Sequence, residues 1–390
     1  MDSAATFEFS LQADGYVFGN GTSRQIGKRA AALGARHVLL TTDKQVRGAG
    51  LLDRAEESLR DAGIKYTIWD GISTEPTFDS VHAGVRFCQQ GEYDVIVAFG
   101  GGSTIDSSKA IGLLSRNAGQ FSDFVDRDNL RKIVQGPPII AVATTSGTAS
   151  DFTRGSGAID PETGIKYWMV GSNKPAFTIV DPLLTLSMPP VVTANTGTDA
   201  LTQAVESFTN RMVNPVADLM NLEAVRVIGR SLRHAVANGD DIHARSEMMY
   251  AASVLVGSGF GNAGLHHVHP IAQLVGDRWR IPHGRSLGLL LPSILEFSMN
   301  GCLEKLGQVA EALGEDVRHK SPRDAARMGI EAIRQMFIDV GTHEPLRNYG
   351  VTEDALLPLA ERYATLPKMA VAPRHVQSAD EVMEIFLRAL

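Results

Sequence analysis

The first part of the chain alternates short apolar, β-branched runs with stretches of helical spacing. The runs that predict strands cover residues 37–42, 65–70, 94–100, 138–144 and 176–181. Residues 22–34 and 51–63 show helical spacing and end in Gly, as a helix C-terminal cap requires. Strands that alternate with helices favour βαβ units around a parallel sheet. We therefore expect an α/β domain here.

The pattern changes after residue 190, where the strand signal fades. Stretches rich in Ala, Leu and Met predict packed helices over residues 198–211, 215–237, 243–262 and 323–340. We place the boundary at Pro189 and Pro190, because this dipeptide cannot continue either kind of element. The expected fold is an α/β domain over residues 1–188 followed by an all-helical domain over residues 189–390. We expect the active site in the cleft between domains, where ligand pockets preferentially form.

Composition narrows the class of protein. The 390 residues are 44% hydrophobic and 21% charged, which is ordinary for a globular protein with a substantial core. The net charge of −7 argues against a nucleic-acid binder. Cys88 and Cys302 lie far apart, so we expect neither a disulfide framework nor a cysteine metal site. The start, MDSAATFEFSLQADG, lacks the features of a secretory signal, and no apolar run approaches the ~18–20 residues of a membrane span. We expect a cytoplasmic protein without a membrane segment.

A glycine-rich stretch follows the strand predicted at 94–100. The sequence DVIVAFG runs into GGSTIDSSKAIGLL, with glycines at 100–102 and a helix expected to start near Ser103 or Thr104. Glycines let the backbone approach a diphosphate, and a helix N-terminus offers it N–H groups and a positive dipole end. Ser103 adds a hydroxyl donor, and Asp106 is suited to capping or anchoring the turn. The alternative is a plain tight turn. The stretch is not the GxGxxG fingerprint, so an ordinary Rossmann domain does not follow.

Two further strand ends carry polar groups. AVATTSGTASDFT places hydroxyls after the strand predicted at 138–144, where they suit a phosphate or the nicotinamide; the alternative is a solvated Ser/Thr turn. Asp43 closes the strand predicted at 37–42. A carboxylate there accepts bonds from a ribose 2′-hydroxyl and repels a 2′-phosphate, which favours NAD over NADP. The alternative for Asp43 is an N-cap of the next helix.

The predicted helical domain contains a set of metal-ligand types. Asp199 and Gln203 are spaced i, i+4, so a helix beginning near Thr196–Thr198 would present both on one face. His269 and His283 follow, the latter after Pro282 and thus expected on a turn or at a helix start. A carboxylate, an amide and two imidazoles suit Fe(II), Zn(II), Mn(II) or Co(II). Alternatively, the histidines form a polar seam between helices, and separated histidines alone are weak support for a metal site.

Together these motifs resemble the iron-containing alcohol dehydrogenases, or metal-dependent group III, over nearly the whole chain. The similar stretches are GNGTSRQIG, LLTTDKQV, AFGGGSTIDSSKA, TTSGTASD, IVDPLLTLSMPP, TGTDAL and IPHG. The resemblance implies a dehydroquinate synthase-like architecture: a parallel-sheet dinucleotide-binding domain followed by a helical metal and substrate domain. It also implies NAD(P)-dependent oxidation of alcohols or reduction of aldehydes, in a homodimer or larger homo-oligomer.

The resemblance also assigns residues, beside those already derived. The predicted cofactor site comprises Asp43, Gly101, Gly102, Ser103, Asp106, Thr144, Thr145, Thr148 and Lys166, of which Lys166 rests on the resemblance alone. The predicted metal ligands are Asp199, His269 and His283, with Gln203 as a weak fourth. The predicted catalytic and substrate residues are His283, Gln273, His267 and Phe260. Of these, Phe260 rests on the resemblance, Gln273 stands where the family has a histidine near the substrate, and His267 is, with His266 and His283, a candidate acid if no metal is used.

The departures from the family pattern leave alternatives open. Gln203 and Gln273 stand where the family has histidines, Ala149 replaces a Gly and Asp151 a Glu. We expect an NAD-dependent alcohol dehydrogenase or aldehyde reductase with weakly held Fe(II) or Zn(II), acting on a small alcohol or aldehyde. One alternative is a metal-independent reductase resembling the maleylacetate reductases, although those depart at the Asp position and this chain keeps Asp199. Two further alternatives are a lyase of the dehydroquinate synthase type and a protein that binds NAD without catalysing a reaction.

Overall fold

A computed structural model describes residues 6–11, 13–125, 133–169, 171 and 173–390. The chain divides into two compact units, one formed by Leu11–Met188 and the other by Pro189–Leu390 with the described residues 6–10. The structure thus differs at the N-terminus from the expected domain over residues 1–188, of which residues 1–5 lie outside the described part. Side-chain amides hold the segment on the helical unit: Asn214 Nδ2 donates to the Glu8 carbonyl, and Asn262 exchanges two hydrogen bonds with the backbone of Ser10.

The α/β unit is built on a six-stranded parallel sheet with the strand order β1-β8-β5-β4-β2-β3. The strands are β1 (Tyr16–Phe18), β2 (His37–Asp43), β3 (Lys65–Ile72), β4 (Val95–Gly100), β5 (Ile139–Ala143) and β8 (Phe177–Val180). All but β1 lie at the predicted positions. Every residue of β4 and β5 is buried, as expected for central strands covered on both faces. β6 (Gly157–Ile159) and β7 (Lys166–Trp168) form a separate antiparallel pair that the pattern did not predict.

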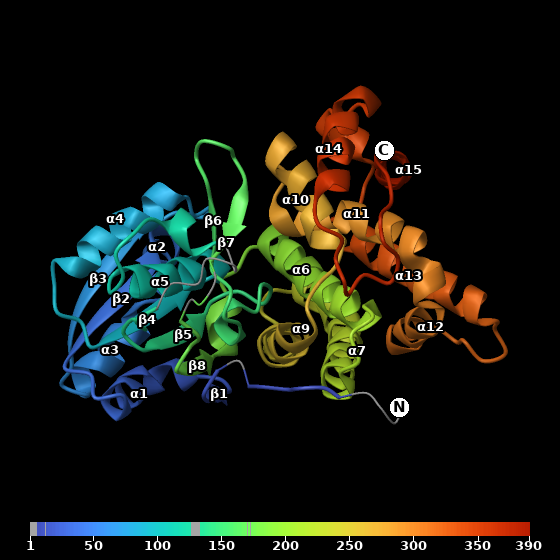
Figure 1. Cartoon of the computed structure of the whole chain (residues 1–390). Coiled ribbons are helices and arrows are strands. Elements are labelled where there is room, and N and C mark those ends of the chain that lie inside the picture. The colour runs from blue at the N-terminus through green and yellow to red at the C-terminus, as the bar shows by residue number, and fades with distance from the viewer. Residues whose placement is uncertain (1–5, 12, 126–132, 170, 172) are drawn as a thin grey trace. The chain divides into compact units, whose positions relative to one another are not determined.

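Helices cover both faces of this sheet. They are α1 (Ile26–Ala32), α2 (Lys44–Gly48), α3 (Asp53–Asp61), α4 (Phe78–Gln89) and α5 (Gly102–Leu114), with 3-10 turns at Thr22–Gln25, Phe121–Phe124, Ser150–Phe152 and Pro182–Thr185. α1 packs beside α3 on one face, and α4 packs beside α5 on the other (Figure 1). This arrangement follows from right-handed crossovers, because the chain moves in opposite directions across the sheet after β2 and after β4.

The second unit is helical, and its described residues contain no strand. Its helices are α6 (Pro190–Thr209), α7 (Pro215–Ala237), α8 (Ile242–Met249), α9 (Gly257–Ala263), α10 (Val268–Trp279), α11 (His283–Ser298), α12 (Leu303–Ala312), α13 (Pro322–Asp339), α14 (Glu353–Thr365) and α15 (Ala379–Ala389). A π-helical segment, Tyr250–Val256, joins α8 to α9, and 3-10 turns lie at Met299–Gly301 and Leu346–Tyr349. The predicted α/β plus all-α class is confirmed.

Helix α6 is the central helix of this unit. It packs against α7, α9 and α11, and every residue from Gly197 to Thr209 is buried. It begins at Pro190, well before the start expected near Thr196, because proline is favoured in the first turn, where its missing N–H has no helical partner. Across the part of the chain that the structure describes, no helix is both long and apolar enough to cross a membrane.

Candidate functional site

The three polar strand ends singled out in the α/β unit meet at one edge of the sheet. β2 and β4 are neighbours, and the connections that follow them lead to opposite faces. In parallel α/β sheets, ligands bind beyond the carboxyl ends of the strands at such a switch point. Asp43 ends β2 and Gly100 ends β4, while the Thr144 N–H donates to the Gly100 carbonyl at 3.0 Å and so places the threonine stretch beside the glycines.

The three glycines of the loop differ in the space around them: Gly100 and Gly102 are closely packed, and Gly101 is not. A Cβ added to Gly100 would lie 2.4 Å from Thr104 Oγ1, and one added to Gly102 would lie 2.4 Å from Thr148 Oγ1, so packing alone excludes side chains there. A Cβ on Gly101 would come no closer than 3.4 Å to the protein, at Thr145. Gly101 is the N-cap of α5, with φ −76° and ψ −173°, a conformation open to any residue. The space over Gly101 is therefore suited to a ligand held at the N-terminus of α5.

Two predicted cofactor residues, Ser103 and Asp106, make side-chain hydrogen bonds within the α/β unit. The Ser103 hydroxyl donates to the Thr74 carbonyl at 2.6 Å, so in this conformation its backbone N–H is the donor left for a phosphate. Asp106 accepts from the Gly157 N–H at 3.3 Å and lies 3.4 Å from the Lys109 ammonium. Asp106 thus anchors the start of β6, whereas its expected part in the glycine turn stays a prediction.

Lys109 supports the same anchor and was not singled out from the sequence. Its side chain is fully buried, and Nζ donates to the Gly155 carbonyl at 2.9 Å. Burial lowers the pKa of Lys109, an effect that the nearby charge of Asp106 opposes. A lysine in the middle of a helix gives no sequence signal of burial, because lysines usually cover solvated faces.

The threonine stretch borders the open space at Gly101. Thr145 is half-buried and supplies the atoms nearest to a Cβ on that glycine, whereas Thr144 is buried. Thr148 packs against Gly102 and donates to the Ser150 hydroxyl at 3.1 Å. Ala149, which replaces a family glycine, has φ +54°, where a non-glycine residue is strained by about 1–2 kcal/mol. The loop therefore keeps a glycine-like backbone although its residue is alanine.

Asp43 serves as the N-cap of α2 and also touches the glycine loop. Oδ1 accepts from the N–H groups of Gln45 and Val46, each at 2.9 Å. Oδ2 accepts from the Thr104 hydroxyl at 3.2 Å. The capping alternative is thus observed. It does not exclude a ribose contact, because the side chain is half-buried and lies at the carboxyl end of β2. Lys166, the remaining predicted cofactor residue, lies in β7 with Nζ 5.1 Å from the Trp168 ring centre.

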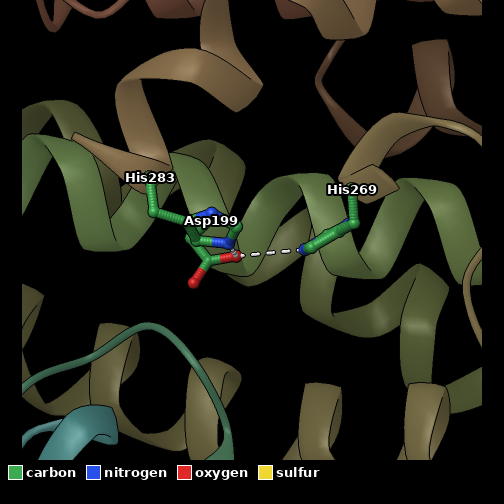
Figure 2. A group of neighbouring side chains, drawn as sticks. All are labelled: Asp199, His269 and His283. Carbon is green, nitrogen blue, oxygen red and sulfur yellow. Dashed lines mark hydrogen bonds and ion pairs between the residues drawn. The ribbon is translucent and has the colours of Figure 1, made fainter. Parts of the chain in front are cut away.

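In the helical unit, three helices bring the predicted metal ligands together. Asp199 on α6, His269 on α10 and His283, the first residue of α11, have donor atoms within 4.8 Å of one another (Figure 2). His269 Nε2 lies 3.4 Å and His283 Nε2 4.0 Å from Asp199 Oδ1. Asp199 is buried and His283 is exposed, so the group has a solvent-facing side. One carboxylate and two imidazoles are a donor set that fits a divalent transition metal.

Gln203 is buried and lies one helical turn after Asp199. Its Nε2 donates to Asp199 Oδ1 at 3.0 Å, so it contacts the carboxylate that faces both imidazoles. An amide nitrogen is not a metal ligand, and a ligand role would require Oε1 to turn towards the ion. Gln203 as fourth ligand stays a prediction.

Glu206, which was not predicted, completes a polar stripe on α6 with Asp199 and Gln203. It is fully buried, and Oε2 lies 2.5 Å from His269 Nδ1. Burial raises the pKa of Glu206, but the charge and hydrogen bond of His269 outweigh it and lower the value to about 2. Burial lowers the pKa of His269, but Glu206 and Asp199 raise it to about 9. The only sequence signal was the spacing i, i+4, i+7, which places all three on one helix face.

The other predicted catalytic residues lie outside this donor group. His267 is buried, with Nδ1 2.7 Å from the Tyr363 hydroxyl and Nε2 2.6 Å from the Arg374 carbonyl, and burial lowers its pKa. The carbonyl can only accept, so Nε2 donates and the Tyr363 hydroxyl donates to Nδ1. A catalytic role for His267 would require breaking one of these bonds. Gln273, one turn after His269 on α10, and Phe260 on α9 are both half-buried.

Comparisons with known proteins agree with this geometry. Residues 13–182 match the family model described as iron-containing alcohol dehydrogenase, and residues 193–390 match the C-terminal model of the Fe-containing alcohol dehydrogenase family. The chain is 37% identical over 375 residues to the 1,3-propanediol dehydrogenase of Klebsiella pneumoniae, covering 95% of this chain and 96% of that protein. It is 33% identical over 346 residues to the NAD-dependent methanol dehydrogenase of Bacillus methanolicus, covering 88% of this chain and 90% of that protein.

The structure resembles a crystal structure of 1,3-propanediol oxidoreductase with a TM-score of 0.93 and 35% identity, covering 99% of this chain and 100% of the other. The match of both halves of the chain confirms the resemblance drawn from the motifs. The chain is therefore an oxidoreductase acting on CH–OH groups, and it belongs to the iron-containing alcohol dehydrogenase family.

Proposed function

We propose that this protein is an NAD-dependent alcohol dehydrogenase and aldehyde reductase that acts on a small alcohol or aldehyde with the help of a divalent metal. The observation that carries the proposal is the convergence of Asp199, His269 and His283 from three helices. Side chains so far apart in sequence meet in a donor set that fits a metal, and the alcohol dehydrogenase relatives give that site its chemical context.

Asp199, His269 and His283 would hold the ion, with Fe(II) as the first candidate and Zn(II) as the second. A divalent ion there supplies Lewis acidity, which favours the deprotonated alcohol and stabilises negative charge on its oxygen. We propose that the ion is labile, since Gln203 is at most a weak ligand and even the loss of a partner outside the ligand set typically costs about 10–100-fold in affinity.

The remaining steps belong to the cofactor and to the residues that orient it. The N–H groups at the start of α5 bind the diphosphate over Gly101, and the threonines at 144, 145 and 148 border that site. Asp43 accepts from the ribose hydroxyls, which favours NAD. The nicotinamide ring, when bound, would supply the hydride chemistry at the carbinol carbon. Phe260 and Gln273 are proposed to line the substrate site with an apolar ring and an amide.

His267 is better suited to holding the start of α10 than to carrying a proton. Its bonds to Tyr363 and Arg374 tie that helix to the chain around α14, and α10 carries His269. We therefore assign it a positioning role. The cytoplasmic location and the homo-oligomeric state expected from the sequence stay predictions.

The proposal is tested with the purified full chain and a panel of small alcohols, diols and aldehydes. Because the relatives include propanediol and methanol dehydrogenases, 1,3-propanediol and methanol are the first substrates to assay. We expect NAD-linked activity that a chelator removes and Fe(II) or Zn(II) restores, with no restoration in His283→Ala. Activity that persists in chelator would support the metal-independent reductase instead. Failure to exchange hydride with any member of the panel would contradict the proposed dehydrogenase.

A further inference from the structure

Buried Glu206 links two parts of the helical unit that the proposed metal site depends on. It lies on α6, two turns after Asp199, and none of its surface is exposed. Oε1 accepts from the N–H of His266 at 2.9 Å and from the N–H of Val268 at 2.7 Å. Oε2 faces His269 Nδ1 at 2.5 Å. A single side chain thus contacts the backbone at the start of α10 and the imidazole that α10 carries.

The donors and acceptors in this contact determine which ring nitrogen of His269 is left for a metal. Oε1 accepts two backbone N–H groups, so Glu206 presents its other oxygen to Nδ1 as an acceptor. Nδ1 therefore carries a hydrogen and donates it to Glu206. A histidine that ligates a metal uses the ring nitrogen without hydrogen, and the bond made by the other nitrogen decides which one that is. For His269 the nitrogen left for a metal is Nε2, which without a metal is hydrogen-bonded to Asp199 Oδ1 at 3.4 Å; a metal would replace the hydrogen on it.

We propose that Glu206 is a positioning residue that makes His269 a metal ligand through Nε2 and holds it in the donor group. The inference rests on the proposed metal function and adds to it a residue that touches neither metal nor substrate. Buried carboxylates that accept from a ligating histidine orient the ring and raise its basicity, and their loss typically costs about 10–100-fold in metal affinity.

Glu206→Gln separates this role from a purely structural one. The carbonyl oxygen of glutamine can keep both backbone bonds to His266 and Val268, so the segment before α10 retains its anchors. The amide nitrogen then occupies the position of Oε2 and can only donate. Nδ1 must accept, the ring hydrogen moves to Nε2, and His269 can no longer ligate from its present position.

Thr209→Val is the matched control. The Thr209 hydroxyl lies 3.2 Å from His266 Nε2 and is buried in the same region, so its loss disturbs the segment without touching His269. Valine keeps the branched shape of threonine. A role limited to holding the segment predicts similar effects of the two substitutions, whereas the positioning role predicts an effect of Glu206→Gln alone.

The experiment measures Zn(II) affinity of the metal-free full chain by competition with a chromophoric chelator. We expect Glu206→Gln to bind about 10–100-fold more weakly than wild type, and Thr209→Val to bind like wild type. NADH affinity and the circular dichroism spectrum should be unchanged in both. In a His269→Ala background, Glu206→Gln should cause no further loss, because Glu206 acts through that imidazole.

Wild-type affinity in Glu206→Gln would overturn the positioning role and leave the metal site standing. Absence of Zn(II) binding by wild type would overturn both, so the two failures are distinguishable. If Glu206→Gln does not fold, Glu206→Asp takes its place: it keeps the charge but withdraws the carboxylate from Nδ1. Weakened Zn(II) binding by that variant would then support the proposal, and unchanged binding would overturn it.

Discussion

The glycine loop of the α/β unit and the donor group of the helical unit are built on different principles. The loop is a continuous stretch in which backbone N–H groups and missing side chains create a place for an anion. The donor group consists of three side chains on α6, α10 and α11, each of which must be aimed. A site made from backbone is largely defined once its strand and helix form. A site made from side chains needs further residues to hold it.

Each unit contains a buried carboxylate that anchors a neighbouring segment. Asp106 accepts from the N–H of Gly157, the first residue of β6, and pairs with buried Lys109, which donates to the Gly155 carbonyl. Glu206 accepts from the N–H groups of His266 and Val268, which holds the start of α10. Only Glu206 also bonds a proposed ligand, His269. We therefore expect substitutions in the glycine loop to weaken cofactor binding by filling its space. Substitutions around the donor group should weaken metal binding by removing ligands or changing their orientation.

The largest effect is expected from filling the glycine loop. Gly101→Val should abolish NADH binding, because its branched side chain would occupy the space proposed for the diphosphate. The fold should survive, since a Cβ at this position meets Thr145 at no less than 3.4 Å and the backbone conformation suits any residue. Fluorescence titration with NADH measures the effect, and Zn(II) binding by the helical unit is the control. Unchanged NADH affinity would mean that the loop is only a turn.

A smaller, graded effect is expected in the donor group. His283→Ala removes a ligand and should leave no metal after dialysis, whereas Gln203→His should retain more Fe(II) or Zn(II) than wild type. Position 203 suits an imidazole because Gln203 already contacts Asp199 from one helical turn away. Metal content is measured by elemental analysis. If wild type and Gln203→His both purify without metal and stay active in chelator, the donor group does not serve as a metal site.

The smallest effect is expected for substitutions of Asp43, which change the preference between NAD and NADP. Asp43→Gly should improve use of NADP relative to NAD at least several-fold, because it removes the charge that repels a 2′-phosphate. It also removes the N-cap of α2, at a cost of about 0.5–2 kcal/mol in stability. Asp43→Asn is the matched variant: it removes the charge but keeps a capping oxygen, so it should shift the preference without that loss of stability.

The two variants are compared by the ratio of kcat/KM for NAD and NADP and by thermal unfolding. A wild-type enzyme that already prefers NADP would contradict the role of Asp43. An effect of Asp43→Gly that is absent in Asp43→Asn would mean that the cap matters and the charge does not.

Local pattern was enough to predict most of the fold. The five longer strands of the parallel sheet follow from β-branched runs, and the helical second half follows from long Ala-, Leu- and Met-rich stretches. Strands β1, β6 and β7 were missed because each has three residues, too few to show a period. The attachment of residues 6–10 to the helical unit was missed as well, because side-chain amides of Asn214 and Asn262 make it across long sequence separations.

The sequence also located the glycine loop and the pair Asp199 and Gln203, since a glycine run at a strand end and an i, i+4 pair are local features. His269 and His283 are not marked by such a pattern, and the family resemblance was needed to assign them. Only the tertiary structure decided that His269 and His283 meet Asp199, and that His267 instead bonds Tyr363 and Arg374. It alone singled out Glu206, because a glutamate within a helix usually faces solvent and nothing local marks it as buried. Burial is set by how α6, α10 and α11 pack, and packing is a property of segments far apart in the chain.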